Sequence, residues 1–477
     1  MATTLSWTES LSLLSVAATC VSVLANTLHG DGEPLVASIA FSGLAFVSCY
    51  ALIRWLGDAF MRRGFKGKDL CKLKQIEMQV LSLSLITHHC IMLIFNRPEM
   101  MGAVCAMVYL FIIIFFIPWP FYKDIVVATS GGGNRDIIKE LELIETGRLL
   151  HRFPHNKLAS YLSAILSLQT IVLLGVGDDL FDIRWRHKVL IPAFAVIPML
   201  VVYFVDFGVT QMVVPVPLRP YLGELFDLGW LYYVYMALMS IFSSNGINIL
   251  AGINGIEVAQ SVVIALLIVI NDTLYLSPFT PYPHPATDSH LFSLYLLLPF
   301  IGVSLALLMH NWYPAKVFVG DTYCYFAGMV FAVVAILGHF SKTLILLLIP
   351  QAFNFVYSAP QIFHLVPCPR HRLPRFNART GLLEPSRVQF TKPLRKPIAE
   401  TLKVLHRLRM LDVEVNAEGQ VVSSSNLTLI NLWLVWFGPM REDRLAMGLL
   451  VFQFAIGLLG LFVRHRMALL IFTADNL

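Results

Sequence analysis

Ten apolar segments, each close to the length that crosses a bilayer, dominate this sequence of 477 residues. A membrane-spanning helix needs about 20 mainly apolar residues, because only a helix or a closed barrel satisfies its own backbone hydrogen bonds in lipid. The segments lie near 34–58, 101–122, 158–177, 189–206, 228–247, 257–275, 291–309, 322–340, 343–362 and 445–463. Charged residues make up only 14% of the chain, against about 25% in a typical soluble protein. The sequence therefore predicts an all-α polytopic membrane protein with about ten transmembrane helices.

Lysine and arginine residues gather in the connectors that follow the odd-numbered segments. If each segment crosses the membrane once, these connectors share one side, and they cover 59–100, 178–188, 248–256, 310–321 and 363–444. Three of the five are strongly basic, whereas a connector on the other side, 276–290, carries Asp288 and no lysine or arginine. Cytoplasmic loops of membrane proteins carry the excess of positive charge. We therefore expect all five connectors to face the cytosol.

The same five connectors, with the segment ends beside them, hold most of the polar residues that are unusual at a membrane edge. They are Asp178, Asp179, Asp182, Lys188, Asn245, Asn248, Asn254, Glu257, His310, Asn311, Asp321, Arg370, His371 and Arg372. Ionisable groups at this depth are costly and by default mark a functional site. Aspartate and asparagine oxygens suit Mg²⁺, which keeps several waters and binds substrate phosphates. A metal ion and cationic side chains stabilise a transferring phosphoryl group, so these residue types predict Mg²⁺-assisted phosphoryl transfer.

Each of these features has another interpretation when it is taken alone. Asp178 and Asp179 are also typical of a solvated helix end, and Asn254 with the following glycine is typical of a turn. The basic residues at 370–372 are also typical of a positively charged anchor beside a span. A multi-span transporter would place polar residues near the membrane as well, but it predicts inverted repeats and paired broken helices, which the sequence does not show. The placement of all these residues on one side favours a single site.

Five runs of this sequence resemble one known enzyme family. They are GDDLFDIRWRHKVLIP (177–192), NGINILAGINGIE (245–257), HNWYPAKVFVGDTYCYFAGM (310–329), GHFSKT (338–343) and PCPRHRLPRFN (367–377). They resemble the eukaryotic UDP-N-acetylglucosamine–dolichyl-phosphate N-acetylglucosaminephosphotransferases, a branch of the polyprenyl-phosphate N-acetylhexosamine-1-phosphate transferases. The resemblance implies Mg²⁺-dependent transfer of N-acetylglucosamine 1-phosphate (GlcNAc-1-phosphate) from UDP-GlcNAc to dolichyl phosphate, with release of UMP. This reaction begins the lipid-linked oligosaccharide pathway for protein N-glycosylation, and tunicamycin blocks it.

The resemblance also implies a role for individual positions. Residues that would handle the acceptor phosphate are Asp178, Asp179, Asp182 and Lys188. Residues that would bind the metal ion are Asn248 and Asp321. Residues that would contact UDP-GlcNAc are Leu70, Glu99, Trp185, Ile249, Asn254, Phe318, Arg370, His371 and Arg372. Lys188 would hold the acceptor phosphate, and whether Asp178 or Asp179 acts as a base stays open.

The resemblance also implies where the protein lies and how its domains are arranged. We expect a multi-pass protein of the endoplasmic reticulum membrane whose active site faces the cytosol, with no nucleic-acid partner. The expected parts are an N-terminal extension (1–33), a transmembrane catalytic core (34–363), a cytosolic subdomain (364–444) and a last helix with its tail (445–477). Short strands are expected at 413–415 and 420–422. A homodimer, downstream glycosyltransferase subunits, another sugar nucleotide and another polyprenyl carrier stay open.

Two apolar segments do not fit the ten-span pattern. Residues 75–96 interrupt the resemblance between its matching parts at 68–70 and 98–102, and they include the apolar run 79–95. A single extra crossing there would put Leu70 and the later loops on opposite sides, so we predict that 79–95 does not span; a gene-model error is the alternative. The weakly apolar segment 9–28 is compatible with a signal anchor, an additional span or an interfacial helix.

Overall fold

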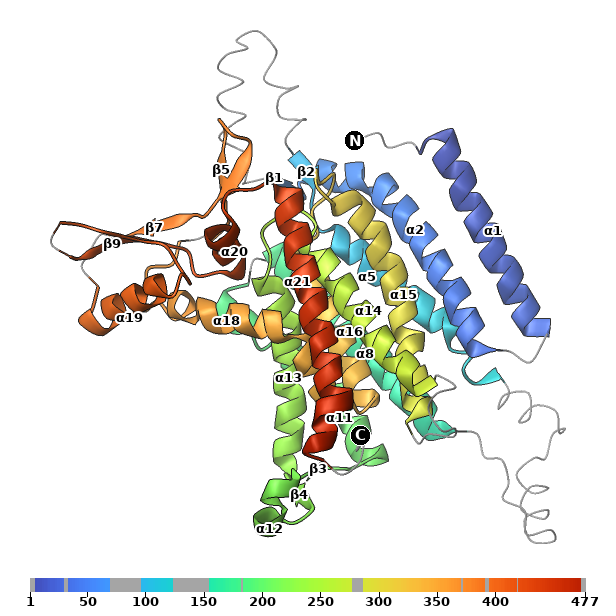
Figure 1. Cartoon of the computed structure of the whole chain (residues 1–477). Coiled ribbons are helices and arrows are strands. Elements are labelled where there is room, and N and C mark those ends of the chain that lie inside the picture. The colour runs from blue at the N-terminus through green and yellow to red at the C-terminus, as the bar shows by residue number, and fades with distance from the viewer. Residues whose placement is uncertain are drawn as a thin grey trace.

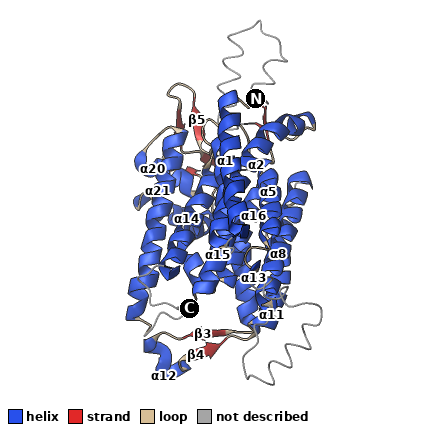
Figure 2. Cartoon of the chain, turned by 90° about the vertical axis from the view of Figure 1, so that its right-hand side faces the viewer, coloured by secondary structure: helices blue, strands red, loops and turns tan. Residues whose placement is uncertain are grey.

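The computed structural model of the chain describes residues 5–29, 33–68, 96–122, 154–181, 183–276, 286–369, 372–390, 394–417 and 419–472. Long helices form a bundle in which most helix axes run in roughly the same direction (Figure 1). Short strands lie at both ends of this bundle, β5 at one end and β3 with β4 at the other (Figure 2). This architecture confirms the predicted all-α polytopic membrane protein.

Each of the ten predicted segments contains at least one helix. The helices are α1 (Trp7–His29), α2 (Pro34–Arg62), α5 (Met101–Phe116), α8 (His155–Phe181), α9 (Trp185–Lys188), α10 (Ile191–Ala195), α11 (Ile197–Asp206), α12 (Arg219–Leu222), α13 (Trp230–Ile249), α14 (Ile256–Leu276), α15 (Thr287–Asn311), α16 (Asp321–Leu337), α17 (Ser341–Leu347), α18 (Ile349–Ile362), α19 (Lys396–Arg407), α20 (Leu429–Phe437) and α21 (Glu442–Phe462). Short turns of helix follow at Val216–Leu218, Val463–Met467 and Ala468–Leu470.

Two predicted segments are interrupted beside prolines, and one of them is also sharply bent. The segment 189–206 contains α10 and α11, and each of these begins with a proline in its first turn, Pro192 and Pro198. The segment 343–362 contains α17 and α18, whose axes differ by 65°, and α18 also starts with a proline, Pro350. Proline is well placed in the first turn of a helix, but it cannot continue a helix that precedes it. Hydropathy alone does not report these breaks.

Within the described part of the chain, seven helical segments are long and apolar enough to cross a bilayer, and the bent pair α17–α18 would be an eighth. One of the seven is Arg186–Asp206, which joins α9, α10 and α11. Helices α5 and α16 are apolar but shorter. The ambiguous segment 9–28 forms α1, which is one of the seven. It packs along α2, where Arg54 lies 3.5 Å from the Glu9 carboxylate and the Tyr50 hydroxyl donates to the same carboxylate at 3.2 Å. Segment 9–28 therefore has the length and composition of a span.

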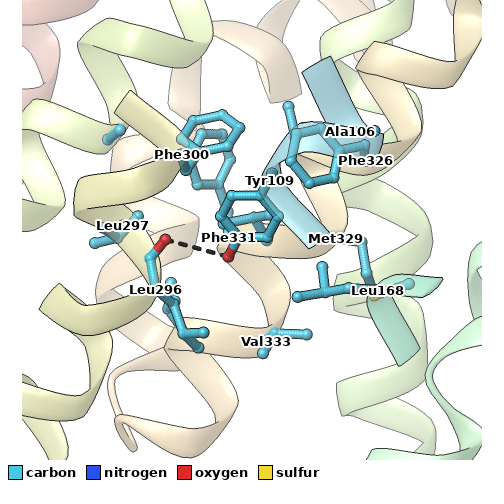
Figure 3. Close-up of a cluster of buried hydrophobic side chains, with 14 of the residues drawn as sticks. Ala106, Tyr109, Leu168, Leu296, Leu297, Phe300, Phe326, Met329, Phe331 and Val333 are labelled. Atoms are coloured by element: carbon cyan, nitrogen blue, oxygen red, sulfur yellow. Dashed lines mark hydrogen bonds between the residues drawn. The ribbon is translucent and has the colours of Figure 1, made fainter. Parts of the chain in front are cut away.

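Helix α16 lies at the centre of the bundle. Every residue from Thr322 to Leu337 is buried, and the helix packs against α13, α8, α15 and α5. Figure 3 shows the aromatic cluster on this axis, in which the Tyr109 hydroxyl donates to the Leu296 carbonyl at 3.1 Å. A Cβ atom on Gly328 would lie 2.3 Å from the Ser244 Cα atom. Small residues of this kind let membrane helices pack closely, so α16 forms a rigid support for the segment that precedes it.

The described part of the chain also contains nine short strands. They are β1 (Lys66–Lys68), β2 (Asn96–Pro98), β3 (Gln211–Val213), β4 (Leu225–Asp227), β5 (Arg375–Asn377), β6 (Leu382–Glu384), β7 (Arg387–Gln389), β8 (Val413–Val415) and β9 (Val421–Ser425). The first six form three antiparallel pairs, and the last three form a sheet in the order β7-β9-β8. The strands predicted at 413–415 and 420–422 are confirmed as β8 and β9. Strands β5 to β9 with α19 and α20 project to one side of the bundle (Figure 1).

The pairing of β1 with β2 bears on the atypical insertion. Lys66 pairs with Pro98, and Lys68 pairs with Asn96. The insertion lies between these strands, and residues 69–95 are outside the described residues. Its two flanking strands nevertheless lie side by side, at the same end of the bundle. The prediction that 79–95 does not span requires its two flanks to lie together in this way, and the insertion itself stays a prediction.

Candidate active site

A lysine between two aspartates forms the centre of the polar cluster. The Lys188 Nζ atom lies 3.1 Å from Asp178 Oδ2 and 2.6 Å from Asp321 Oδ2. Asp178 stands near the end of α8, Lys188 ends α9, and Asp321 begins α16, so three elements converge here. The Asp178 side chain is only 1% exposed, whereas Asp321 is 35% exposed. The lysine neutralises a buried carboxylate, and Asp321 remains accessible to a ligand.

The second aspartate of the pair is bound differently. Asp179 accepts hydrogen bonds from the backbone N–H groups of Asp321 at 2.8 Å and of Thr322 at 3.1 Å. It also accepts one from the Thr322 hydroxyl. These are the unsatisfied donors at the start of α16, where a carboxylate is favourable. Asp179 thus positions Asp321, while Asp178 stands beside Lys188.

A cavity of about 390 Å³ opens next to Asp321. Its lining residues are Gly67, Glu99, Asn248, Ala251, Gly252, Ile253, Asn254, Glu257, Asn311, Phe318, Val319, Gly320, Asp321, Cys324, Leu373 and Glu442. Five residues to which the resemblance gives a role are in this group: Glu99, Asn248, Asn254, Phe318 and Asp321. Asn248 and Asp321 line the same cavity, so one carboxamide and one carboxylate are available to a cation there.

On the aromatic side of the cavity, backbone hydrogen bonds to β2 and to the residues after it hold Phe318 in place. The Phe318 N–H donates to the Pro98 carbonyl at 2.8 Å, and the Phe318 carbonyl accepts from the Met101 N–H at 3.2 Å. A Cβ atom on Gly67 would lie 2.7 Å from the Phe318 ring. Glu99 is in the same segment, and burial together with the negative charges of Asp179 and Asp321 raises its pKa. The flanks of the insertion therefore build one wall of the cavity.

The loop between α13 and α14 forms another part of the cavity wall, and two carboxylates fix this loop. The Gly252 N–H donates to Glu257 Oε1 at 3.1 Å, and the Asn254 N–H donates to Glu442 Oε1 at 2.7 Å. Glu257 belongs to the polar group that the sequence predicted at this site, although no specific role was given to it, whereas Glu442 was not predicted. Glu442 is the first residue of α21, and an acidic residue at a predicted membrane edge was the available signal. Its contact with Asn254 spans 188 positions, so no local pattern shows it.

The remaining predicted residues are placed as follows. Ile249 ends α13 beside Asn248 but does not line the cavity. The Arg372 carbonyl accepts a hydrogen bond from Asn431 at 3.0 Å, and its neighbour Leu373 lines the cavity. Trp185 begins α9. Four predicted residues lie outside the described residues: Leu70, Asp182, Arg370 and His371.

Comparison with known proteins bears directly on this arrangement. A family model described as "Glycosyl transferase family 4" matches residues 161–339. A UDP-N-acetylglucosamine–dolichyl-phosphate N-acetylglucosaminephosphotransferase of Saccharomyces cerevisiae is 51% identical over 93% of this chain and 94% of its own length. The protein of the same name from Schizosaccharomyces pombe is 46% identical over 95% of this chain and 97% of its own length. The chain belongs to this N-acetylglucosaminephosphotransferase family.

The family model matches only some of the residues that line the cavity. Residues 161–339 include Asn248, Phe318 and the whole Lys188 centre, by which we mean Lys188 with Asp178 and Asp321. The other wall residues, such as Glu99 and Glu442, lie outside that range but within the relatives' near-complete overlap with the chain. A Dictyostelium discoideum protein with the same enzyme name is 44% identical over 66% of this chain. Membership therefore rests on nearly the whole length of the chain.

The residues of this transferase fit a magnesium ion. No group of three or more His, Cys, Asp or Glu side chains that could hold a metal is found among the residues that the structure describes. Mg²⁺ does not need such a group, since it binds through one or two carboxylates, substrate phosphates and waters. Asp321, Asn248 and the open cavity between them fit that requirement.

Proposed function

We propose that this chain transfers GlcNAc-1-phosphate from UDP-GlcNAc to dolichyl phosphate, giving GlcNAc-PP-dolichol and UMP. The observation that carries the proposal is the Lys188 centre, at 2.6 Å from Asp321, beside the cavity that Asn248 and Phe318 line. A cationic side chain next to a carboxylate and a carboxamide suits a lipid phosphate facing a nucleotide pyrophosphate. The names of the relatives identify the same two substrates.

The reaction is one displacement at phosphorus. An oxygen of dolichyl phosphate attacks the β-phosphorus of UDP-GlcNAc, and the bond from that phosphorus to the oxygen shared with the α-phosphate breaks. UMP leaves with the bond electrons. A phosphate monoester is already largely ionised at neutral pH, because its second pKa is about 6. The acceptor therefore needs orientation more than deprotonation, and no strong base is required.

Each described residue has a specific task in this proposal. Lys188 holds the acceptor phosphate, and the buried Asp178 fixes the lysine in place. Phe318 provides a flat apolar surface for the uracil ring, and the loop of Asn254 contacts the nucleoside. Asp321 and Asn248 would hold Mg²⁺, which when bound stabilises charge on the pyrophosphate.

We also propose an orientation in the endoplasmic reticulum membrane with the site facing the cytosol. The end of the bundle that carries the site also carries the described basic residues Arg62, Arg63 and Lys66, which end α2 and begin β1, and Arg184 and Arg186 beside Lys188. Cytosolic loops are the basic ones. An epitope inserted after Gly419, at an exposed turn, is expected to be digested by protease added to sealed microsomes. Protection of that epitope would contradict the orientation.

The enzymatic test uses membranes from cells that express the chain as their only such transferase. Radiolabelled UDP-GlcNAc and dolichyl phosphate should give labelled lipid and UMP. The label should disappear with a chelator, return with Mg²⁺, and be blocked by tunicamycin. Asp321→Asn is the matched inactive control, because it keeps the shape of the side chain but removes the charge. Equal lipid labelling from UDP-GalNAc, or labelling that persists with Asp321→Asn, would contradict the proposal.

A further inference from the structure

Helix α19 is strongly amphipathic, yet only part of its apolar face is covered by protein. We call residues 372–437, with β5 to β9, α19 and α20, the side domain. Leu402 is 2% exposed and packs in the core of the side domain, with Ile398 and Leu405 beside it. Val404 and Leu408, four residues apart and so on one face, are 49% and 64% exposed. The apolar face of α19 therefore continues past the core into an uncovered flank.

A second apolar feature adjoins this flank. A cavity of about 370 Å³ lies between α18 and α19. Tyr357 and Pro360 of α18 and Leu405 of α19 are among its lining residues, and Val356 and Leu365 line it while remaining 68% and 55% exposed. Most of the side chains that line this open cavity are apolar. An apolar opening of this kind is suited to a hydrocarbon chain.

The position of α19 along the bundle axis indicates whether its exposed side chains face water or lipid. Figure 1 shows α19 below β7 and β9, level with α18 and lower than the end of α21 that lies near β1, rather than beyond that end. Helix α18 is itself the second half of a bent candidate span. The exposed flank of α19 thus lies at the depth of membrane-spanning helices, where Val451 of α21 is 62% exposed.

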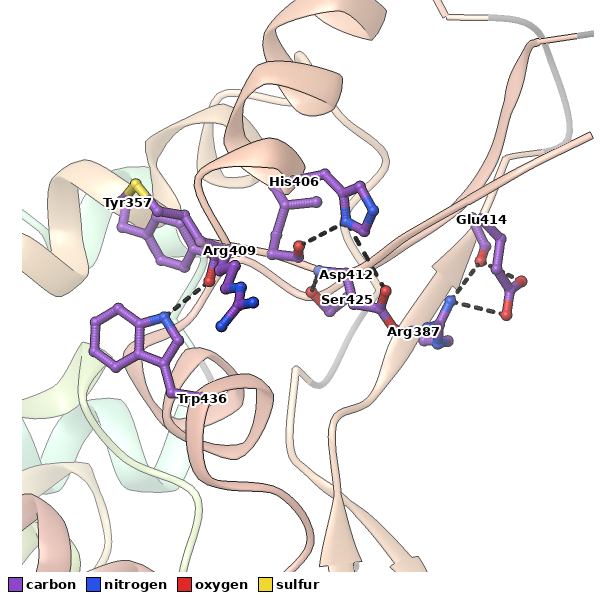
Figure 4. A network of polar contacts seen from close by, with 11 residues as sticks. Tyr357, Arg387, His406, Arg409, Asp412, Glu414, Ser425 and Trp436 are labelled. Carbon is purple, nitrogen blue, oxygen red and sulfur yellow. Dashed lines mark hydrogen bonds and ion pairs between the residues drawn. The ribbon is translucent and has the colours of Figure 1, made fainter.

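Polar and aromatic groups at the end of α19 fit a membrane interface. The Trp436 indole, 45% exposed, donates to the Arg409 carbonyl at 2.8 Å (Figure 4). The Tyr357 hydroxyl donates to the Met410 carbonyl. Lys403 and Arg407 lie on the face of α19 opposite to Leu405, by helical spacing. Tryptophan and long cationic side chains are enriched where one end of a group is apolar and the other is hydrated.

We propose that α19 is an interfacial helix seated in the leaflet on the side of the candidate site. Val404 and Leu408 lie in the acyl region, and a lipid acyl chain fills the cavity between α18 and α19. In water, this flank would be an uncovered apolar patch at the depth where the other helices meet lipid. The seating anchors the side domain, whose Leu373 contacts Gly252 in the cavity of the candidate site. This proposal stands independently of the substrates proposed above.

Photo-crosslinking in nanodiscs tests the seating. A benzophenone amino acid replaces Val404, and the matched control replaces Val422, which is 42% exposed on β9. Val422 follows the buried Val421 in the strand, so it points to the opposite face of the sheet. Val451 is the positive control. Lipid adducts, measured by mass spectrometry of the intact protein, should form at position 404 as at 451 and at least fivefold more than at 422.

Two outcomes would overturn the proposal. One is a lipid yield at position 404 no higher than at 422, and the other is an adduct at 404 to protein instead of lipid. Position 408 gives an independent repeat if the 404 variant does not elute as a single species. Transfer activity does not enter the readout, so failure of the lipid contact is distinguishable from failure of the proposed reaction.

Discussion

At the scale of single residues, the central feature is the ion pair between Lys188 and the buried Asp178. Replacing Lys188 by methionine should lower kcat/KM by about 100-fold or more, because a charge that stabilises the phosphoryl oxygens is lost. It should also lower the free energy of unfolding by about 3–5 kcal/mol, because the Asp178 carboxylate stays buried without a partner. Transfer kinetics and thermal unfolding in the same detergent measure the two effects.

The double variant Lys188→Met with Asp178→Asn separates catalysis from stability. Asparagine carries no charge, so the unfolding free energy should return toward that of the wild type. Activity should stay low because the cation is still missing. Recovery of activity in the double variant would show that Lys188 serves only to neutralise Asp178.

Asp179 is expected to act through helix α16 rather than on the substrate. Asp179→Ala should cost about 1–2 kcal/mol of stability, because the first N–H groups of α16 lose their acceptor. Asp179→Asn keeps an acceptor oxygen and should cost only a few tenths of a kcal/mol. Chemical denaturation measures both. Equal losses for the two variants would contradict the capping role.

Glu99 should make stability depend on pH. Its pKa is raised by burial and by Asp179 and Asp321. An acid with a higher pKa in the folded than in the unfolded state favours folding below its unfolded pKa, and this contribution is lost as pH rises through the folded pKa. Glu99→Gln should therefore melt above the wild type at pH 8, with a difference that shrinks toward pH 5. Glu224→Gln, at a side chain 84% exposed, should show no such trend.

At the scale of elements, the turn before α16 requires glycine for two reasons. Gly320 has a φ of +81°, and a Cβ atom there would lie 2.9 Å from Asp179 Oδ2 and 3.0 Å from the Met100 Cα atom. Gly438 has a similar φ of +78° with open space around it. Gly438→Ala should cost about 1–2 kcal/mol from backbone strain alone. Gly320→Ala should cost more and should also lower activity, as measured by unfolding and transfer assays.

Sequence reasoning found the helical segments because the thickness of the bilayer sets the length of the apolar segment that crosses it. It did not find the breaks at Pro192, Pro198 and Pro350, since hydropathy is insensitive to a missing backbone N–H. It brought Lys188 and Asp321 to one site through loop parity and resemblance. It missed Glu442, because a hydrogen bond to Asn254 across the fold leaves no mark in local spacing. Only the structure shows that the neighbouring Asp178 and Asp179 have different roles, one beside Lys188 and the other at the start of α16.

At the scale of the whole molecule, the insertion between β1 and β2 should be dispensable. Deleting 75–95 leaves six residues, 69–74, to join Lys68 to Asn96, whose backbones are already paired. Connections of about 2–6 residues are ordinary between neighbouring strands. The shortened protein should keep its KM for UDP-GlcNAc within about twofold, a range of about 0.4 kcal/mol. A large rise in KM would show that the insertion contributes to the nucleotide wall.

The central claim is that N-acetylglucosamine is transferred together with the β-phosphate of UDP-GlcNAc at the Lys188 centre. UDP-GlcNAc labelled with ³²P in the β-phosphate and ³H in the sugar tests it in a single reaction with purified protein and dolichyl phosphate. The account predicts that both labels enter the lipid in equal molar amounts, with one UMP released for each. Tritium in the lipid without ³²P, accompanied by UDP, would contradict it.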